Sequence, residues 1–513
     1  MAKATGLVSN LFKENMMKMS KIALAVAALV SATSAFAAPV TQADIEAARV
    51  GGTLDQAWIS GASASIKAVY EGWVGSGTAI GCDSGTNTIF TSSTATTAVA
   101  PGALGNFLAY ACKKGTRTRV LYHTADGGSL NAFTPYTKGT ELARVKYVGT
   151  STCGTSVSYT DSTNAENNAT IIRGCQQVGN KLPADGVATA ASNATNAAAL
   201  IADANGPRKP VGGFSDVEPA VLPASLGGGD VSAFGSVAPA YFTQAFGVVV
   251  SKPLYRALQV AQGIANNTDA LDPNYDPANA PTITKAQYTS IINQGGAYHT
   301  DWSPILGATG TGKAVKLFRR VNSSGTQASS NAYFLANPCA TAVAGNYNPA
   351  SAADTVAGSF EVTEGAGTGD VLSGITTAGN AGGYAIGVVS AENDWRTAST
   401  ANNGFRFVKL DGVHPEAGDT TNARATLVSG QYEFAMESVA FTASGLTGFG
   451  STILADIVTG ITNPPSTAAC NVLPRGLALN PLGSYNPAFC SVGAQVTKVT
   501  NLGNSCSPLQ LVQ

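Results

Sequence analysis

Short apolar runs alternate with amphipathic stretches along most of the chain, and this alternation predicts an α/β fold. The apolar run Val315–Phe318 precedes two arginines, a Ser-Gly-Thr turn and a helix that we expect over Gln327–Asn337. Near Gly61, small residues lead into a second helical pattern whose apolar positions are Ile66, Val69, Tyr70 and Trp73. A strand, a loop of small residues and a helix therefore recur as a unit.

Similar units extend the pattern along the chain. We expect strands at Val120–His123, around Gly213, and at Phe246–Lys252, Gly383–Val389, Phe405–Leu410 and Tyr432–Phe434. Thr284 and Gln287 form a capping-box pattern that predicts a helix ending near Gly295. Two stretches rich in small and polar residues, Ala188–Asn205 and Ala340–Gly382, are expected to be surface loops.

The first residues have the pattern of a secretory signal. Lys18 and Lys21 precede the apolar run Ile22–Val30, and Ala35–Ala37 has the small-x-small form of a cleavage site. We therefore expect a signal peptide over residues 1–37, and a translation start at Met16, Met17 or Met19 is the alternative to one at Met1. No later apolar run reaches the ~20 residues of a membrane helix, so the mature protein is expected in the periplasm or outside the cell.

Composition narrows the chemistry. Charged residues are 12% of the chain and the formal net charge is −1, so nothing favours binding to nucleic acid. Eight cysteines without CxxC spacing predict disulfides in an oxidising compartment, with Cys153–Cys175 and a pair among Cys470, Cys490 and Cys506 preferred. Three widely separated histidines give no pattern of metal ligands, so we expect no metal site and no cofactor.

The segment after Val315–Phe318 is the strongest candidate site. The N–H groups of a first helical turn lack intrahelical partners and carry the positive end of the dipole, so they favour an oxyanion. Ser324 and Thr326 add hydroxyl donors, Gly325 permits close approach, and Arg320 supplies a planar charged fork. The alternative is an ordinary Ser/Thr cap beside a surface arginine.

A second glycine-rich motif has a different explanation. Gly307–Lys313 matches the front of a nucleotide-binding P-loop, but Ala314 replaces the expected Ser/Thr and a strand follows instead of a helix. We interpret it as a simple glycine loop.

The order of these motifs resembles that of periplasmic phosphate-binding proteins of ABC transporters, a group of two-lobed solute-binding proteins. The matching segments are Gly61–Ser65, Gly127–Ser129, Ser215-Asp216, Phe246–Lys252, Gly295/Gly296 with Trp302, Arg319–Thr326, Gly383-Tyr384 and Lys409–Gly412. Only the Arg-Ser-Gly-Thr segment is specific. Asn322 and Ser323 stand where the family usually has Asp and Gly.

The resemblance implies a type II-like α/β periplasmic-binding-protein fold with crossover strands and decorated loops. Lobe 1 would span 38–248 with an insertion at about 135–210, and lobe 2 would span 249–395 with a loop at about 340–382. Residues 396–513 would return to lobe 1 and end in a disulfide-pinned tail. Phe246–Lys252 would be one crossover and the Gly383–Val389 region the return.

The resemblance also implies the ligand and partners: a monomer that captures inorganic phosphate in an interlobe cleft and delivers it to an ABC permease. The implied ligand residues are Ser65, Ile66, Ser129, Asp216, Arg320, Ser324, Gly325 and Thr326. The assignment of Ser129 is weaker because the family's spacing is not reproduced there.

Asp216 gives the phosphate hypothesis a chemical basis. A buried carboxylate repels an oxyanion unless the ligand still carries a proton to donate, so Asp216 would favour hydrogen phosphate over sulfate. Its alternative role is a helix cap ahead of Val217. Two other functions stay open: a surface or matrix protein that kept the scaffold, and a phosphate-ester hydrolase. The hydrolase lacks a metal cluster and a Gly-x-Ser-x-Gly elbow, so we expect no enzymatic activity.

Overall fold

The computed structural model describes residues 38–75, 82–95, 104–161, 167–178, 203, 205–264, 276–295, 299–340, 348–396, 404–463, 473–485 and 494–512. The expected signal peptide and almost all of the expected Ala188–Asn205 loop lie outside these residues. Residues 39–513 group as one unit with a mixed α/β fold, as predicted.

Three parallel strands form the centre of the first half of the sheet. β1 (Leu54–Gly61) lies between β4 (Arg117–Thr124) and β7 (Gly212–Ser215) and pairs with both in parallel. Beyond β4 the sheet continues through β3 (Phe107–Lys114), β2 (Thr88–Thr91), β6 (Ala169–Ile172) and β5 (Ser156–Tyr159). Apolar side chains alternate between two core clusters, with Ile59 on one face of β1 and Trp58 on the other.

The second half repeats the parallel arrangement. β10 (Val315–Arg320) lies between β11 (Phe360–Gly365) and β12 (Ala385–Ser390), again in parallel. The long strand β8 (Gly235–Ser251) pairs with β15 (Ala435–Ala443) and β16 (Leu477–Leu479) in the first half. It pairs with β12 and β13 (Phe405–Phe407) in the second. Among the described residues, pairing is therefore continuous over 14 strands, and the two halves share β8, whose first part pairs in one half and whose last part, Phe246–Ser251, pairs in the other.

The crossover strands agree with the sequence prediction at one point and differ at another. Phe246–Lys252 falls almost entirely in the C-terminal part of β8, so the first crossover lies where the apolar run predicted it. The expected return at Gly383–Val389 was wrong, because among the described strands β12 pairs with β10 and with the second-half part of β8. β15 makes the return, since it pairs with β7 as well as with β8.

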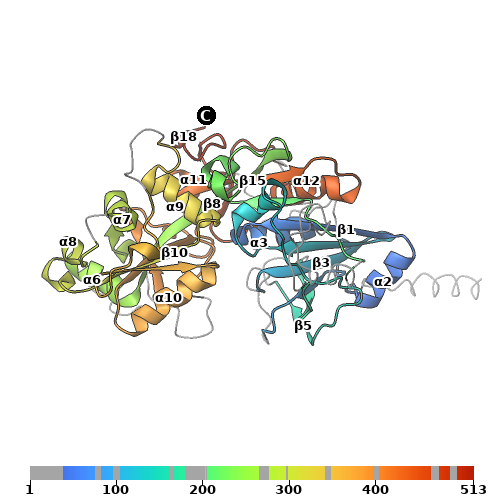
Figure 1. Cartoon of the computed structure of the whole chain (residues 1–513), viewed down its shortest axis with the longest axis horizontal. Coiled ribbons are helices and arrows are strands. Elements are labelled where there is room, and N and C mark those ends of the chain that lie inside the picture. Colours follow the sequence, from blue (N-terminus) through green and yellow to red (C-terminus); the bar gives the residue numbers. More distant parts are fainter. Residues whose placement is uncertain are drawn as a thin grey trace, which may run out of the picture. The chain divides into compact units, whose positions relative to one another are not determined.

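Helices cover both faces of the sheet. In the first half, α3 (Ile66–Gly75) and α12 (Phe449–Thr462) pack together on one face, and α2 (Gln42–Val50) lies on the other. In the second half, α9 (Gly325–Leu335) and α10 (Thr368–Asn380) lie on opposite sides of β10 (Figure 1). Side chains of β10 alternate between the two core clusters that these helices complete.

The remaining elements are shorter. The helices are α4 (Thr134–Thr137), α6 (Lys252–Ala261), α7 (Lys285–Ile292), α8 (Ser303–Leu306) and α11 (Ala425–Ser429). The strands are β2 (Thr88–Thr91), β5 (Ser156–Tyr159), β6 (Ala169–Ile172), β9 (Thr282–Ile283), β13 (Phe405–Phe407), β14 (Lys409–Leu410), β16 (Leu477–Leu479), β17 (Val499–Thr500) and β18 (Gln510–Leu511).

Several local predictions are confirmed. The capping box formed by Thr284 and Gln287 starts α7, and α9 occupies the helix expected after the Ser-Gly-Thr turn. The P-loop-like segment forms a short 3₁₀ turn, Gly307–Gly310, that leads into β10, so it is a glycine loop.

Two regions correct the sequence analysis. Ala340–Gly382 is not a surface loop throughout, because it contains β11 and α10, which contribute Phe360, Val371 and Ile375 to the core. The many Gly and Thr residues hid this helix, whose apolar positions are few. Tyr432–Phe434 precedes β15 instead of forming a strand.

Disulfides join three pairs of the described cysteines. Cys153–Cys175 is the predicted pair, and Cys82–Cys112 links β3 to the segment before β2. Cys506 pairs with Cys339, far away in sequence, and not with another of the last three cysteines. Cys470 and Cys490 lie outside the described residues. Within the described ranges, no helix has both the length and the apolar character needed to cross a membrane.

The contact between α3 and α12 gives a stability prediction. A Cβ added at Gly72 would lie 2.4 Å from the carbonyl oxygen of Ile457, so Gly72→Ala should force the helices apart and cost about 1–3 kcal/mol. In α10, no atom lies within 4 Å of a Cβ built at Gly369. Gly369→Ala is therefore the matched control and should be neutral or stabilising by up to about 1 kcal/mol. Denaturant unfolding measures both, and equal effects would contradict this packing.

Candidate functional site

The carboxyl ends of the parallel strands bring the candidate residues together. In the first half, β1, β4 and β7 lead into the segments that carry Ser65, Ser129 and Asp216. In the second half, β10 leads through Arg320 into the turn that precedes α9. Ligand sites of open α/β sheets form at such carboxyl ends, which makes this edge the natural place for a site.

Asp216 and Ser129 form the centre of the cluster. The Ser129 hydroxyl donates to Asp216 Oδ2 at 3.0 Å, and the Asp216 N–H donates to Ser129 Oγ at 3.3 Å. Both residues are buried. This pair lies directly against the start of α9, because a Cβ added at Gly325 would be 2.1 Å from Ser129 Oγ and 2.5 Å from Asp216 Oδ2. The two halves of the sheet therefore meet at Gly325.

A second close approach lies beside the first. Gly128 has a φ of 85°, and a Cβ there would lie 2.9 Å from the Cα of Ser324. The Leu130 N–H donates to the Ser323 carbonyl at 3.1 Å. The loop after β4 and the turn before α9 are thus joined by backbone contacts as well as by the Asp216 pair.

Arg320 is a buried cation held by uncharged acceptors. Its side chain is 2% exposed, with Nη1 donating to Thr368 Oγ1 at 2.9 Å and Nη2 donating to the Ala366 carbonyl at 2.8 Å. The Nε–H is buried and has no hydrogen-bond acceptor among the described residues. Burial lowers the pKa of Arg320, and the negative charge of Asp216 opposes that shift. Thr368 and Ala366 thus orient a guanidinium that keeps donor capacity.

The first turn of α9 adds further donors. Ser324 occupies the N-cap position, yet its hydroxyl makes no capping hydrogen bond to the helix. Thr326 is 3% exposed and lies in the first turn of the helix. The alternative of an ordinary Ser cap therefore does not describe Ser324, and the arginine beside it is not on the surface.

The pKa of Asp216 is shifted by its buried surroundings. Burial raises its pKa to about 6, while the hydrogen bond from Ser129 and the charge of Arg320 lower it. The N-cap of the next 3₁₀ turn, Pro219–Val221, is Glu218. Asp216 is therefore not the cap that the sequence left open as its alternative role.

Ser65 and Ile66 lie beside this cluster through neighbouring residues. Ser65 Oγ donates to the Ala62 carbonyl at 2.8 Å, and Ile66 begins α3. The Ala62 N–H donates to the Phe214 carbonyl at 2.8 Å, which ties the Ser65 turn to β7, the strand that precedes Asp216. No described hydrogen bond joins Ser65 or Ile66 to Asp216 or Arg320 themselves.

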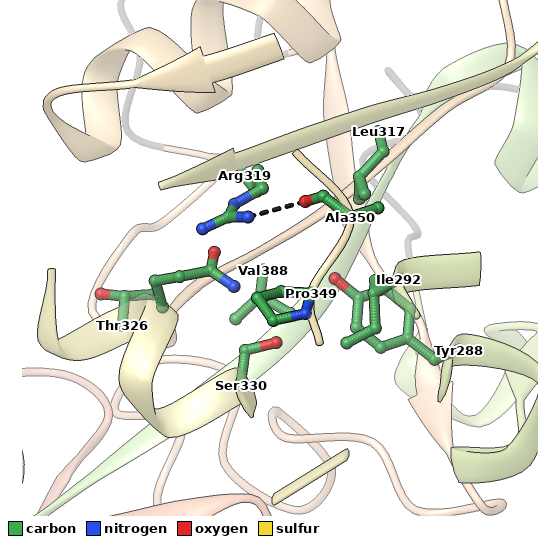
Figure 2. Close-up of a pocket in the computed structure, with 10 residues that line it drawn as sticks. Tyr288, Ile292, Leu317, Arg319, Thr326, Ser330, Pro349, Ala350 and Val388 are labelled. Atoms are coloured by element: carbon green, nitrogen blue, oxygen red, sulfur yellow. Dashed lines mark hydrogen bonds between the residues drawn. The ribbon is translucent and has the colours of Figure 1, made fainter. Parts of the chain in front are cut away.

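The neighbouring Arg319 faces another environment. Figure 2 shows its guanidinium above a small cavity lined by Tyr288, Ser330 and Pro349, with a hydrogen bond of 2.6 Å to the Ala350 carbonyl. The cavity has a volume of about 10 Å³, room for about one water molecule. Successive side chains of a strand point to opposite faces, so only one of the two arginines can serve the Asp216 cluster.

Four residues of this region were missed by the sequence analysis. Thr368 and Ala366 follow β11, in a segment that was expected to be a loop. Glu392 follows β12, and burial raises its pKa to about 7, with Lys67 lowering it and Asp216 raising it further. Lys67 directly follows Ile66, so its position beside a candidate residue was a usable signal.

The raised pKa of Asp216 predicts a pH-dependent cost to folding. An acid whose folded pKa lies above its unfolded value loses stability as pH rises from about 4 through 6, here by about 3 kcal/mol. Asp216→Asn has no such titration. In phosphate-free buffer, its unfolding free energy relative to the parent should therefore rise by about that amount between pH 4 and pH 8. A difference that stays constant with pH would contradict the raised pKa.

No family model matches the chain, and no curated protein matches it. An ABC-type phosphate transport receptor from Vibrio cholerae aligns over 51% of this chain and 75% of its own, at 14% identity and a TM-score of 0.27. PstS from Borrelia burgdorferi aligns over 51% and 75%, at 12% identity and a TM-score of 0.26. A possible phosphate binding protein from Planctomyces limnophilus aligns over 79% and 86%, at 10% identity and a TM-score of 0.29. At these TM-scores the likeness carries no argument about this chain's ligand.

Proposed function

We propose that the chain binds hydrogen phosphate at the cluster of Asp216, Ser129, Arg320 and the first turn of α9. The observation that carries this proposal is the buried Nε–H of Arg320, which has no acceptor within the described part of the chain. A guanidinium buried without a full set of acceptors is costly, and a bidentate oxyanion supplies two acceptors in the geometry of the planar fork.

The balance of donors and acceptors favours a partly protonated anion. Arg320, the Ser324 hydroxyl and the N–H groups at the start of α9 can donate, whereas ionised Asp216 can only accept. Hydrogen phosphate offers oxygens to the donors and one hydroxyl to Asp216. Sulfate has no hydrogen at neutral pH, so its oxygens would face the carboxylate without a shared proton.

Binding is favoured over hydrolysis by the positions of the histidines. His123 lies 3.4 Å from the Tyr110 hydroxyl, His299 contacts the Ile291 carbonyl, and His414 contacts the Phe407 carbonyl. Burial lowers the pKa of both His123 and His414 to about 3. No group of three potential metal ligands occurs in the described ranges. We therefore infer a binding protein without catalytic residues.

The biological role in this proposal is solute capture outside the cytoplasm. The signal-like pattern of the first residues supports a location in the periplasm or outside the cell, and an ABC permease would receive the phosphate from a monomeric binder. A surface or matrix protein that uses the same cluster without transport is the alternative. Calorimetry of the mature protein with phosphate, sulfate and phosphate esters tests the ligand, and phosphate uptake by a deletion strain tests transport.

Arg320→Lys should weaken phosphate binding by on the order of 2–3 kcal/mol, because an ammonium cannot reproduce the paired contacts of the planar fork. Arg319→Lys is the matched control, since the same change is made one residue away on the opposite face. It should lower stability through the Ala350 contact and leave phosphate affinity near that of the parent. Calorimetry checks both variants, and equal losses would remove Arg320 as the anchor.

Asp216→Asn should admit sulfate while keeping appreciable phosphate affinity. The amide removes the repulsion between carboxylate and sulfate and adds a donor. The difference in binding free energy between phosphate and sulfate, worth several kcal/mol in the parent, should therefore become smaller. Competition of labelled phosphate against sulfate, at fixed ionic strength and pH 8, measures the change. Sulfate exclusion that is the same in parent and variant would leave Asp216 without a role in selectivity.

A further inference from the structure

The C-terminal segment 499–506 is fastened to the sheet by a buried carboxylate. Glu437 of β15 accepts from the Thr500 hydroxyl, from the Asn501 N–H at 3.1 Å and from the Gly503 N–H at 2.7 Å. Glu437 is 6% exposed, so these hydrogen bonds form away from water. Hydrogen bonds to a charged acceptor are about twice as strong as neutral ones. The segment therefore has a fixed position beside β15.

The same segment holds the loop that carries Asp216. Glu218 lies just after Asp216, and its two carboxylate oxygens accept from the Ser505 N–H and from the Ser505 hydroxyl, each at 2.6 Å. Burial raises the pKa of Glu218, and the two hydrogen bonds from Ser505 lower it. Ser505 thus fixes Glu218, and with it the backbone that follows Asp216.

The residue after Ser505 is bonded covalently to the far end of α9. Cys506 forms a disulfide with Cys339, which lies shortly after the last residue of α9, Leu335. The other end of α9 is the Gly325 turn that contacts Asp216. The loop that carries Asp216 is therefore connected to α9 in two ways. Two hydrogen bonds and one disulfide connect it to the C-terminal end of α9, and the contact with Gly325 connects it to the N-terminal end.

We propose that Glu218, Ser505 and the Cys339–Cys506 disulfide position Asp216 against the first turn of α9 and so determine the affinity of the oxyanion site. They act as positioning residues and do not touch the ligand. This inference rests on the proposed function for its affinity readout. The pH at which Asp216 titrates is independent of the proposed function, because it can be measured without a ligand.

Apolar packing between the loop after β7 and α9 is an alternative explanation for the position of Asp216. Val217 and Val221 pack in one core cluster with Ala328 and Ala332 of α9. If this packing alone placed Asp216, loosening the C-terminal segment would lower stability and leave the site unchanged. The packing is non-directional, however, whereas the Glu218 hydrogen bonds fix both distance and orientation. The two sources of position therefore predict different results for mild substitutions.

The test uses small changes that leave the core intact. Ser505→Ala removes one hydrogen bond to Glu218, and Glu218→Gln replaces one of its acceptor oxygens. Each should weaken binding of inorganic phosphate on the order of 10-fold in calorimetry. Ser505→Thr keeps the hydroxyl and should restore the affinity of the parent.

The disulfide is tested against a matched pair. Cys339→Ser with Cys506→Ser should weaken phosphate binding as Ser505→Ala does. Cys153→Ser with Cys175→Ser removes a disulfide that joins the segment before β5 to the segment after β6. It should therefore lower stability without changing phosphate affinity.

A second readout is the pH at which Asp216 titrates. It is obtained by measuring the unfolding free energy of each variant, with and without Asp216→Asn, as a function of pH, and taking the midpoint of the difference. A shifted midpoint together with weaker binding supports the proposal. Affinities within about two-fold of the parent and an unchanged midpoint would overturn it. If the parent itself binds no phosphate, the proposed function fails, and the midpoint alone still decides whether these residues position Asp216.

Discussion

The contact of Gly325 with Ser129 and Asp216 is the constraint on which the site depends. Any side chain at residue 325 would occupy the place of Ser129 Oγ and Asp216 Oδ2. Because Gly325 begins α9 and Asp216 follows β7, this one contact fixes a helix of the second half of the sheet against a loop of the first. Gly128 repeats the arrangement beside it, where its backbone approaches Ser324. Two glycines from different halves thus allow the halves to meet without side chains between them.

Burial gives this meeting point its chemistry. Arg320 and Asp216 are both removed from water, and burial moves their pKa values in opposite directions, down for the arginine and up for the carboxylate. The charge of each residue opposes the pKa shift of the other, although no salt bridge between them is described. A ligand that accepts from Arg320 and donates to Asp216 would satisfy both groups at once. An anion without a hydrogen would satisfy only the first.

The sequence predicted what is local and missed what joins distant segments. Arg320 through Thr326 form a strand end, a turn and a helix start, and short-range spacing was enough to predict each of them. The expected α/β class and the crossover at Phe246–Lys252 came from apolar runs in the same way. Thr368 was missed because α10 has few apolar positions, which made its segment look like a loop. Cys506 was paired with near neighbours in the sequence, whereas its true partner is 167 residues away.

The surroundings of the site further limit what it can attract. Lys67 and Arg320 bring positive charge, and Asp216 and Glu392 bring negative charge, the latter with a pKa raised to about 7 by burial. The chain as a whole has a formal net charge of −1, so no strong field draws anions from a distance. Affinity must then come from short-range hydrogen bonds whose geometry is set before the ligand arrives. That requirement gives a physical reason for Arg320 to be held by Thr368 and Ala366, and for Asp216 to be held by Ser129, instead of either being free to turn toward water.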